Sequence, residues 1–230
     1  MVTENLKKVE KKIESACTRA GRDRNDVTLI AVSKTKPVEM MREAMQCGIV
    51  TFGENKVQEI VEKQKELTEP LDWHMIGHLQ RNKVKQVVGR VKRIHSVDSI
   101  RLAKQIQLES EKRNITSDIL IEVNMAKEES KYGFMPEEVE EAIREISTYP
   151  NVKIHGLMTI APYTEDPESN RDYFREIKKL SVDIRDKNID NVNVSILSMG
   201  MTNDYEVAIE EGATMVRVGT GIFGARNYNI

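Results

Sequence analysis

The sequence is poor in the residues that mark secreted and membrane proteins. Its 230 residues include two cysteines, one tryptophan and 5% aromatic side chains. Cys17 and Cys47 are too few for a disulfide framework, and both fall in helical patterns, where we expect small buried apolar side chains. No apolar run approaches the ~18 residues of a membrane span, and the N-terminus is too highly charged for a signal peptide. These absences predict a cytoplasmic protein without a membrane segment.

An excess of charge of either sign is also missing. The 35 basic and 37 acidic residues leave a net charge of −2, so no overall field draws the chain to nucleic acid or to a membrane surface. The stretch 81–93 (RNKVKQVVGRVKR) is basic but lacks interleaved aromatic residues, and we interpret it as a solvated helix face. His74 and His78 straddle a strand end and a loop, so no metal site is expected.

The sequence does contain a regular alternation of β-rich and helical segments. Strands are predicted at 28–34, 51–55, 72–77, 93–99, 117–124, 152–160, 193–200 and 215–219. Helices are predicted at 2–20, 37–48, 56–67, 82–89, 100–113, 136–146, 173–184 and 203–212. Such alternation favours a parallel sheet covered by helices, and eight units match a (β/α)8 TIM barrel. We therefore predict one α/β barrel domain over residues 1–230 with an extra N-terminal helix; an open doubly wound sheet is the alternative.

A glycine pattern near the end of the chain needs an explanation. Gly219, Gly221 and Gly224 spell G-x-G-x-x-G, which in a dinucleotide-binding protein opens a βαβ unit with an acidic residue about 20 residues later. The sequence ends at Ile230, so neither feature can follow. The pattern therefore does not indicate a dinucleotide site.

The predicted barrel suggests a phosphate site instead. In such barrels the active site lies at the carboxyl ends of the strands, and phosphate is often bound after the seventh and eighth. The segments 198–201 (SMGM) and 217–221 (RVGTG) end these two strands with small residues that let backbone N–H groups approach an anion. Thr202 or Asn203 is expected to cap a helix that begins near Asp204 and faces the same place. Tight turns without a ligand are the alternative.

Lys34 ends the first predicted strand and is the candidate nucleophile. A lysine drawn into a barrel mouth loses its proton more readily and can then attack a carbonyl carbon. Together with a phosphate site, it suggests a Schiff base with a phosphorylated aldehyde or ketone; a solvated lysine is the alternative. Lys36 competes for this role, but Pro37 favours extended geometry before it and places Lys36 further from the sheet. Ser198 has no obvious His or Asp partner by spacing, so a hydrolase triad is not expected.

These segments resemble a known family. AVSKTKP, FGENKVQE, WHMIGHLQRNK, HSVDS, GLMTIAP and SMGMTNDYEVAIEEGATMVRVGTGIFGARNY occur in the order typical of the pyridoxal phosphate homeostasis protein family. Its members are single-domain relatives of the N-terminal barrel of alanine racemase, and the resemblance covers nearly the whole chain. Lys56 departs from the pattern, because an aromatic residue is common at that position.

The resemblance implies a set of cofactor-binding residues. It implies that Lys34 forms the aldimine with pyridoxal 5′-phosphate (PLP), that Arg217 faces the pyridine nitrogen and that Asn55 lies near the ring. The residues implied for the phosphate are Ser198, Gly200, Met201, Gly219 and Thr220. A guanidinium does not give up its proton at working pH, so Arg217 would donate to the ring nitrogen and keep it unprotonated. An unprotonated pyridine is a poor electron sink, which disfavours carbanion chemistry.

The resemblance also implies a function: holding PLP and delivering it within the cell, without robust catalysis and with no catalytic residue. Racemisation needs a second base, which alanine racemase takes from a separate domain, and the length leaves no room for one. The expected partners are PLP and PLP-dependent apoenzymes, and we expect a monomer. The alternatives are a weak PLP-dependent amino-acid racemase, a Schiff-base aldolase and a regulator that binds nucleic acid through 81–93.

Overall fold

The computed structural model of the protein describes residues 1–128 and 130–225. Eight parallel strands pair in chain order, and β8 pairs with β1, so the sheet closes into a barrel. The strands are β1 (Thr28–Val32), β2 (Thr51–Glu54), β3 (Asp72–Met75), β4 (Arg93–Val97), β5 (Ser117–Glu122), β6 (Val152–Met158), β7 (Val192–Met201) and β8 (Met215–Val218). The predicted barrel is confirmed, and the open sheet is excluded.

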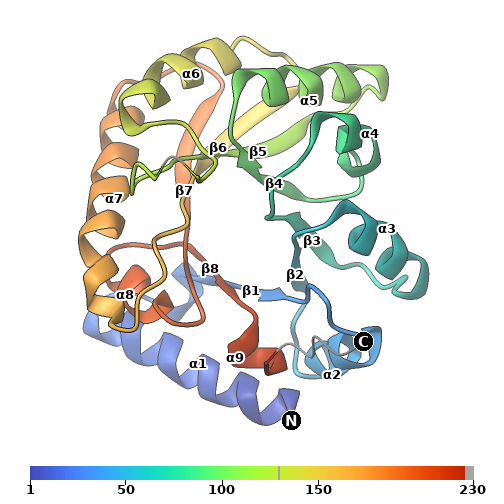
Figure 1. The fold of residues 1–230 in the computed structure, drawn as a ribbon, viewed down its shortest axis with the longest axis vertical. Helices are drawn as coiled ribbons and strands as arrows, with labels where there is room; N and C mark the ends of the chain where they lie inside the picture. Colours follow the sequence, from blue (N-terminus) through green and yellow to red (C-terminus); the bar gives the residue numbers. More distant parts are fainter. Residues whose placement is uncertain (129, 226–230) are drawn as a thin grey trace.

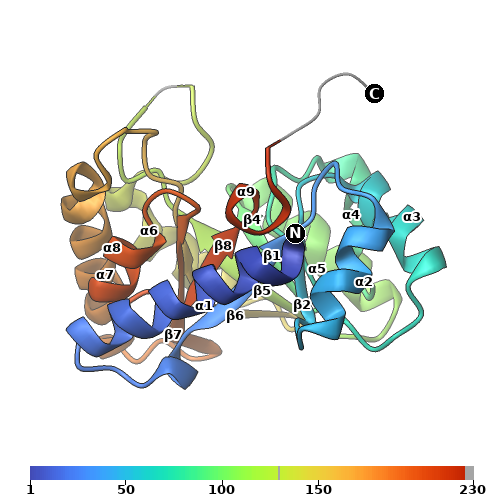
Figure 2. The same cartoon turned by 90° about the horizontal axis from the view of Figure 1, so that it is seen from below.

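Helices form a ring around the barrel (Figure 1). They are α1 (Val2–Arg19), α2 (Val38–Gln46), α3 (Val57–Glu66), α4 (Val84–Val87), α5 (Ile100–Lys112), α6 (Val139–Ile146), α7 (Arg171–Asp186), α8 (Tyr205–Glu210) and α9 (Thr220–Phe223). The extra N-terminal helix α1 contacts α2, α8 and α9, so it covers the seam where β8 meets β1. Figure 2 shows α1 running along this side of the barrel.

The apolar stripe of α1 explains how this helix covers the seam. Val2, Leu6, Val9 and Ile13 recur at helical spacing and are all buried. The helix stops before Gly21, whose positive φ of 63° is a left-handed conformation that glycine adopts without strain. The predicted helix over 2–20 is therefore confirmed.

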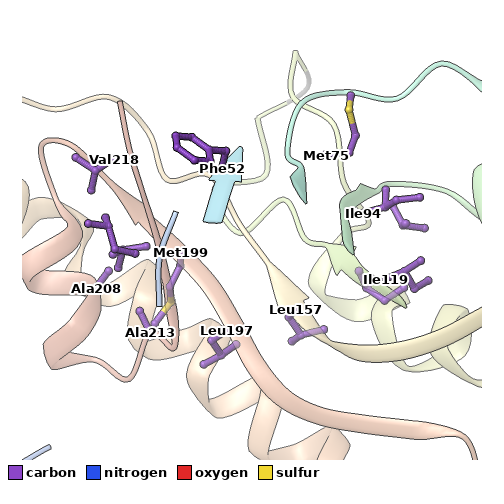
Figure 3. Close-up of a cluster of buried hydrophobic side chains, with 14 of the residues drawn as sticks. Phe52, Met75, Ile94, Ile119, Leu157, Leu197, Met199, Ala208, Ala213 and Val218 are labelled. Atoms are coloured by element: carbon purple, nitrogen blue, oxygen red, sulfur yellow. The ribbon is translucent and has the colours of Figure 1, made fainter. Parts of the chain in front are cut away.

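The layer between strands and helices is apolar. Figure 3 shows part of it, with Phe52, Leu157 and Val218 from strands of the barrel and Ala208 from α8. Phe52 packs beside Trp73 with ring centroids 6.2 Å apart. Each fully buried side chain of this kind contributes about 1.5–3 kcal/mol relative to exposure, so this layer is the main source of stability.

Alternate residues of the strands face the barrel interior. One point of close backbone approach lies there, at Gly156 of β6, where an added Cβ would stand 1.8 Å from the carbonyl oxygen of Ile196. The register between β6 and β7 shifts just before this pair. Only glycine fits at this point of β6, because any side chain would clash with the backbone of β7.

Three details differ from the sequence-based expectations. The predicted helix at 82–89 is only a 3-10 turn, Arg81–Lys83, followed by the single turn α4. Arg93 is not part of a solvated helix face, because it is buried at the start of β4, 3.7 Å from Asp118. The prediction for Cys47 is wrong: it ends α2 and is exposed, whereas Cys17 is buried as expected. Within the described ranges, no helix is long and apolar enough to cross a membrane.

Candidate functional site

Lys34 lies at the mouth of the barrel, directly after β1. The side chain of Ser33 points outward, because its hydroxyl donates to Glu54 Oε1 at 2.7 Å in the layer beneath α3. β1 ends at Val32, and Lys34 follows in the turn at the carboxyl end of the barrel, where it is half-buried. The structure therefore places this lysine where the sequence predicted it.

An ion-pair cluster binds the backbone of the turn that carries Lys34, at the residue before it and at the residue after it. Lys63 on α3 donates to the Ser33 carbonyl at 2.7 Å, to Glu54 Oε1 at 2.6 Å and to Glu59 Oε2 at 3.0 Å. Glu59 in turn accepts the backbone N–H of Thr35 at 2.7 Å. Thr35 has a positive φ of 61°, which is strained for threonine, so these bonds hold a conformation that the turn alone disfavours. Burial raises the pKa of Glu54, and the Lys63 ammonium partly offsets this rise.

The competing lysine, Lys36, has a different role. Its ammonium donates to the carbonyl oxygens of Phe223, Gly224 and Ala225 at 3.2, 3.0 and 2.8 Å. These carbonyls lie at and just beyond the C-terminal end of α9, where a cation is stabilising. Lys36 therefore ties α9 to the β1–α2 loop.

Arg217 is anchored inside the barrel below the mouth. Its Nη1 donates to Ser198 Oγ at 2.6 Å and its Nη2 to the carbonyl oxygen of Thr159 at 2.8 Å. The side chain is 3% exposed, and burial lowers the pKa of Arg217 to about 10. The guanidinium therefore remains charged at neutral pH and can only donate.

Two buried histidines continue this contact across the barrel. His95 Nδ1 lies 2.9 Å from Ser198 Oγ, and His95 Nε2 lies 2.7 Å from His74 Nδ1. Burial lowers the pKa of His74 to about 3 and that of His95 well below its ordinary value, so both rings are neutral. Ser198 thus does have a histidine partner, contrary to the sequence-based expectation. It still lacks the geometry of a hydrolase nucleophile, because its oxygen is fully buried and already accepts from Arg217.

His78 is separate from the other two histidines. It lies at the rim, where Nδ1 is 2.9 Å from Asp98 Oδ2 and the ring stacks on Tyr132 with centroids 3.7 Å apart. His74 and His78 therefore face different surroundings. Among the residues that the structure describes, no group of three or more His, Cys, Asp or Glu side chains is arranged to hold a metal ion.

The loops after β7 and β8 form a crowded backbone surface beside Lys34. Gly200 has a φ of 88°, and a Cβ there would stand 2.6 Å from Ala208 Cβ. A Cβ on Gly219 would stand 3.3 Å from the carbonyl oxygen of Val32, two residues before Lys34. Gly200 therefore allows the end of β7 to approach α8, and Gly219 allows the end of β8 to approach the end of β1.

Two side chains hold these loops in shape. Thr202 Oγ1 accepts the N–H groups of Gly219 at 3.2 Å and Gly221 at 3.4 Å. Asp204 Oδ1 accepts the N–H of Met201 at 2.7 Å, and Asp204 rather than Thr202 or Asn203 precedes the first residue of α8. The predicted capping residue is therefore corrected. Thr220 is exposed at the start of α9, where a backbone N–H has no acceptor within the helix.

Asn55 borders the mouth on the side of β2. A Cβ on Gly77 would stand 2.5 Å from the Asn55 carbonyl oxygen, so the backbones after β2 and β3 touch at the rim. Asn55 is half-buried there. The structure therefore gathers Lys34, Asn55, Arg217 and the two glycine loops around one end of the barrel.

One buried carboxyl group below the mouth was not predicted to matter. Glu122 ends β5 and is 6% exposed, and within the described residues its Oε2 has no hydrogen-bond partner. Burial and the neighbouring Asp98 raise the pKa of Glu122 to about 7, against the attraction of Arg217. This carboxyl group is therefore close to half-ionised at neutral pH.

The sequence interpretation missed His95, Lys63 and the burial of Glu122. His95 lies inside a predicted strand rather than at its end, and Lys63 lies in a helix rich in charge. A polar residue at an inward position of an otherwise apolar strand is the signal that could have identified His95. No comparable signal marks Lys63, because its partners lie in other elements.

Comparisons with known proteins agree with this geometry. Residues 5–227 match the family model of the alanine racemase N-terminal domain. A protein of Aquifex aeolicus named pyridoxal phosphate homeostasis protein is 49% identical over 226 residues, covering 98% of each chain. A relative of the same name from Pseudomonas aeruginosa is 39% identical, covering 99% of this chain and 96% of its own.

A solved structure carries the likeness further. PipY of Synechococcus elongatus with PLP bound superposes with a TM-score of 0.84 at 33% identity, covering 97% of this chain and all of that one. A relative with the same fold over nearly the whole chain therefore holds PLP.

Proposed function

The chain belongs to the pyridoxal phosphate homeostasis protein family, and from this premise we propose that it holds PLP through Lys34 and passes it on without robust catalysis of its own. PLP supplies an aldehyde for an amine, a ring nitrogen and a phosphate. Those three groups need a lysine, a hydrogen-bond donor and a backbone surface at one end of the barrel. The observation that carries the proposal is that Lys34, in the turn after β1, and Arg217, on the neighbouring strand β8, lie at the same end of the barrel as the two glycine loops.

Lys34 fits the aldehyde because its turn is held rigidly. The contacts of Lys63 and Glu59 fix the residues on either side of it, so the amine is presented from one backbone conformation. Lys36 is a poorer candidate because three carbonyl oxygens already occupy its ammonium. Condensation of the amine with the aldehyde releases one water and forms one C=N bond.

Arg217 fits the ring nitrogen. Two of its N–H groups donate to Ser198 and Thr159, and a guanidinium has three further N–H groups. A donor that keeps its own proton leaves the nitrogen unprotonated, and this makes the ring a poor electron sink and disfavours long-lived carbanions.

The glycine loops fit the phosphate. We assign it to the segment from Ser198 to Met201 together with Gly219 and Thr220. Support comes from Gly200 and Gly219, which have no side chain of their own, and from Thr220, which begins α9 and has a backbone N–H without an acceptor within the helix. Because the hydroxyl of Ser198 is bonded to Arg217 and His95, we assign Ser198 to this corner through its backbone.

The test of the site compares Lys34→Ala with Lys56→Ala, an exposed lysine of the next loop. Each purified protein is incubated with PLP, desalted, reduced with borohydride and mapped by mass spectrometry. The native chain and Lys56→Ala should carry the label on Lys34, and Lys34→Ala should carry none. A stable label on Lys36, or an unchanged absorption band in Lys34→Ala, would contradict the assignment.

Carrier and racemase are distinguished by exchange of the α-hydrogen of alanine in D2O. The carrier should exchange it no faster than free PLP at the same concentration. Delivery is tested by mixing the loaded protein with an apo-aminotransferase and alkaline phosphatase, which destroys free PLP. Activation that survives the phosphatase supports direct transfer, and activation that the phosphatase abolishes contradicts it.

A further inference from the structure

The deepest part of the site is a line of buried polar groups that leads away from Arg217. It runs from Arg217 on β8 to Ser198 on β7, then to His95 on β4 and His74 on β3. The side chains of Ser198 and His95 are fully buried, and those of Arg217 and His74 are 3% and 1% exposed. His95 meets Ser198 across the interior, because β4 and β7 are not neighbours in the barrel.

The direction of each bond in this line follows from the fixed charge of Arg217 and from the burial of Ser198. Arg217 has no acceptor, so Ser198 Oγ must accept from Nη1. Ser198 is fully buried, and within the described residues the other partner of its hydroxyl is His95 Nδ1. A buried hydroxyl proton without an acceptor is costly, so Ser198 donates to His95 Nδ1, which must then be unprotonated. His95 is neutral, so its proton is on Nε2 and is donated to His74 Nδ1. Both rings are thus fixed as the Nε2–H form.

We propose that His95, acting through Ser198, is a positioning residue that fixes where the Arg217 guanidinium can donate. An acceptor at His95 Nδ1 keeps the Ser198 proton turned away from Arg217, and the Ser198 lone pair therefore stays available to Nη1. With Thr159 holding Nη2, the plane of the guanidinium is set from two sides. The inference rests on the proposed function, in which Arg217 meets the ring nitrogen of PLP.

The first arm of the test needs no cofactor. Nitrogen-15 NMR of the histidine rings in the unloaded protein should show His74 and His95 as neutral Nε2–H tautomers. Ser198→Ala should shift the Nδ1 resonance of His95, because that atom loses its donor. A proton on Nδ1 of His95, or no shift in Ser198→Ala, overturns the proposal whether or not the protein binds PLP.

The second arm measures the dissociation constant for PLP. His95→Leu should weaken PLP binding about tenfold, because Arg217 would no longer be held in place to donate its hydrogen bond to the ring nitrogen. A tenfold loss is the size expected for one hydrogen bond from a charged group. His95→Asn keeps an acceptor near the place of Nδ1 and should restore most of that loss. His155→Leu, at the opposite end of the barrel beside Asp118, should bind as the native chain does.

Equal weakening in His95→Leu and His95→Asn would overturn the proposal, because it would indicate a packing role alone. Circular dichroism and thermal melting establish that each variant is folded before binding is measured. If His95→Leu does not fold, Ser198→Ala takes its place in the binding series, with the same tenfold loss expected. A native chain that fails to bind PLP would contradict the proposed function instead, and the NMR arm would still decide the tautomers.

Discussion

The two faces of the barrel wall differ sharply in chemistry. Toward the helices, β2, β6 and β8 present Phe52, Leu157 and Val218, which form one apolar layer. Toward the interior, β4, β7 and β8 place His95, Ser198 and Arg217 in contact. The interiors of such barrels are usually filled by branched aliphatic residues. The difference indicates that the apolar layer between strands and helices supplies most of the stability. The polar side chains inside the barrel near its mouth are instead available for binding a ligand.

The largest effect is expected when a large side chain is removed from the apolar layer between strands and helices. Phe52→Ala removes a fully buried ring beside Trp73 and should lower the free energy of unfolding by about 3–5 kcal/mol. Leu108 on α5 is 42% exposed, so Leu108→Ala should change it by no more than about 0.5 kcal/mol. Urea unfolding measures both, and similar losses in the two variants would break the comparison.

The next largest effect is expected at the ionic cluster of Lys63, Glu54 and Glu59 within the outer layer. Lys63→Met leaves the buried Glu54 carboxylate without its cation and should cost about 3 kcal/mol of unfolding free energy at pH 7. The double variant Glu54→Gln/Lys63→Met should recover most of this loss. Lys65→Met, at an exposed position of α3, is the matched control. An equal loss in the single and double variants would show that the cluster acts by packing and not by charge.

The interior should behave in the opposite way at Glu122. Its pKa is about 7 in the folded protein, above the ordinary 4.5, so the folded state binds this proton more tightly than the unfolded state. Its contribution to stability therefore falls as pH rises from about 4.5 to 7. Glu122→Gln should be about 2 kcal/mol more stable than the native chain at pH 8 and about equal to it at pH 5.

The matched control for that prediction is Glu62→Gln, at an exposed position of α3. Urea unfolding at pH 5, 6, 7 and 8 gives the profile of each protein. The same gain at every pH, or a gain in the control, would refute the titration of Glu122 as its source.

The smallest effect is expected at the rim, where the two regions meet. Lys36→Ala removes the cation that binds the last carbonyls of α9 and should cost about 1 kcal/mol. Lys8→Ala, at an exposed position of α1, should cost less than about 0.5 kcal/mol. Thermal melting resolves the difference, and a Lys36→Ala protein that melts with the native chain would remove Lys36 from this role.

The outer layer could be predicted from the sequence far better than the interior. Eight strands and the helices between them follow from local periodicity and from punctuation by residues such as Pro37, Gly48 and Pro136. The length of a one-turn helix such as α4 cannot be predicted in this way. The apolar residues of 82–89 have helical spacing, but this spacing does not show how many helical turns form. Cys47 was assigned to the core on helical pattern alone, but it ends α2 at the surface.

The candidate site also has a part that the sequence predicts and a part that it does not. Lys34, Asn55 and the glycine loops are at strand ends, and parallel strands bring their ends to one rim without further information. The contact of His95 with Ser198 joins residues 103 positions apart across the barrel. It depends on barrel closure and on register shifts in β4 and β7 that leave no trace in local sequence.

The central claim is that Arg217, inside the barrel, donates a hydrogen bond to the pyridine nitrogen of PLP without giving up its proton. This claim is tested most directly at the pyridine nitrogen itself. The measurement is the nitrogen-15 chemical shift of PLP labelled at the pyridine nitrogen and bound to the protein, followed from pH 6 to pH 9. The account predicts an unprotonated, hydrogen-bonded nitrogen throughout in the native chain and a changed shift in Arg217→Lys. A protonated nitrogen at neutral pH in the native chain would contradict it.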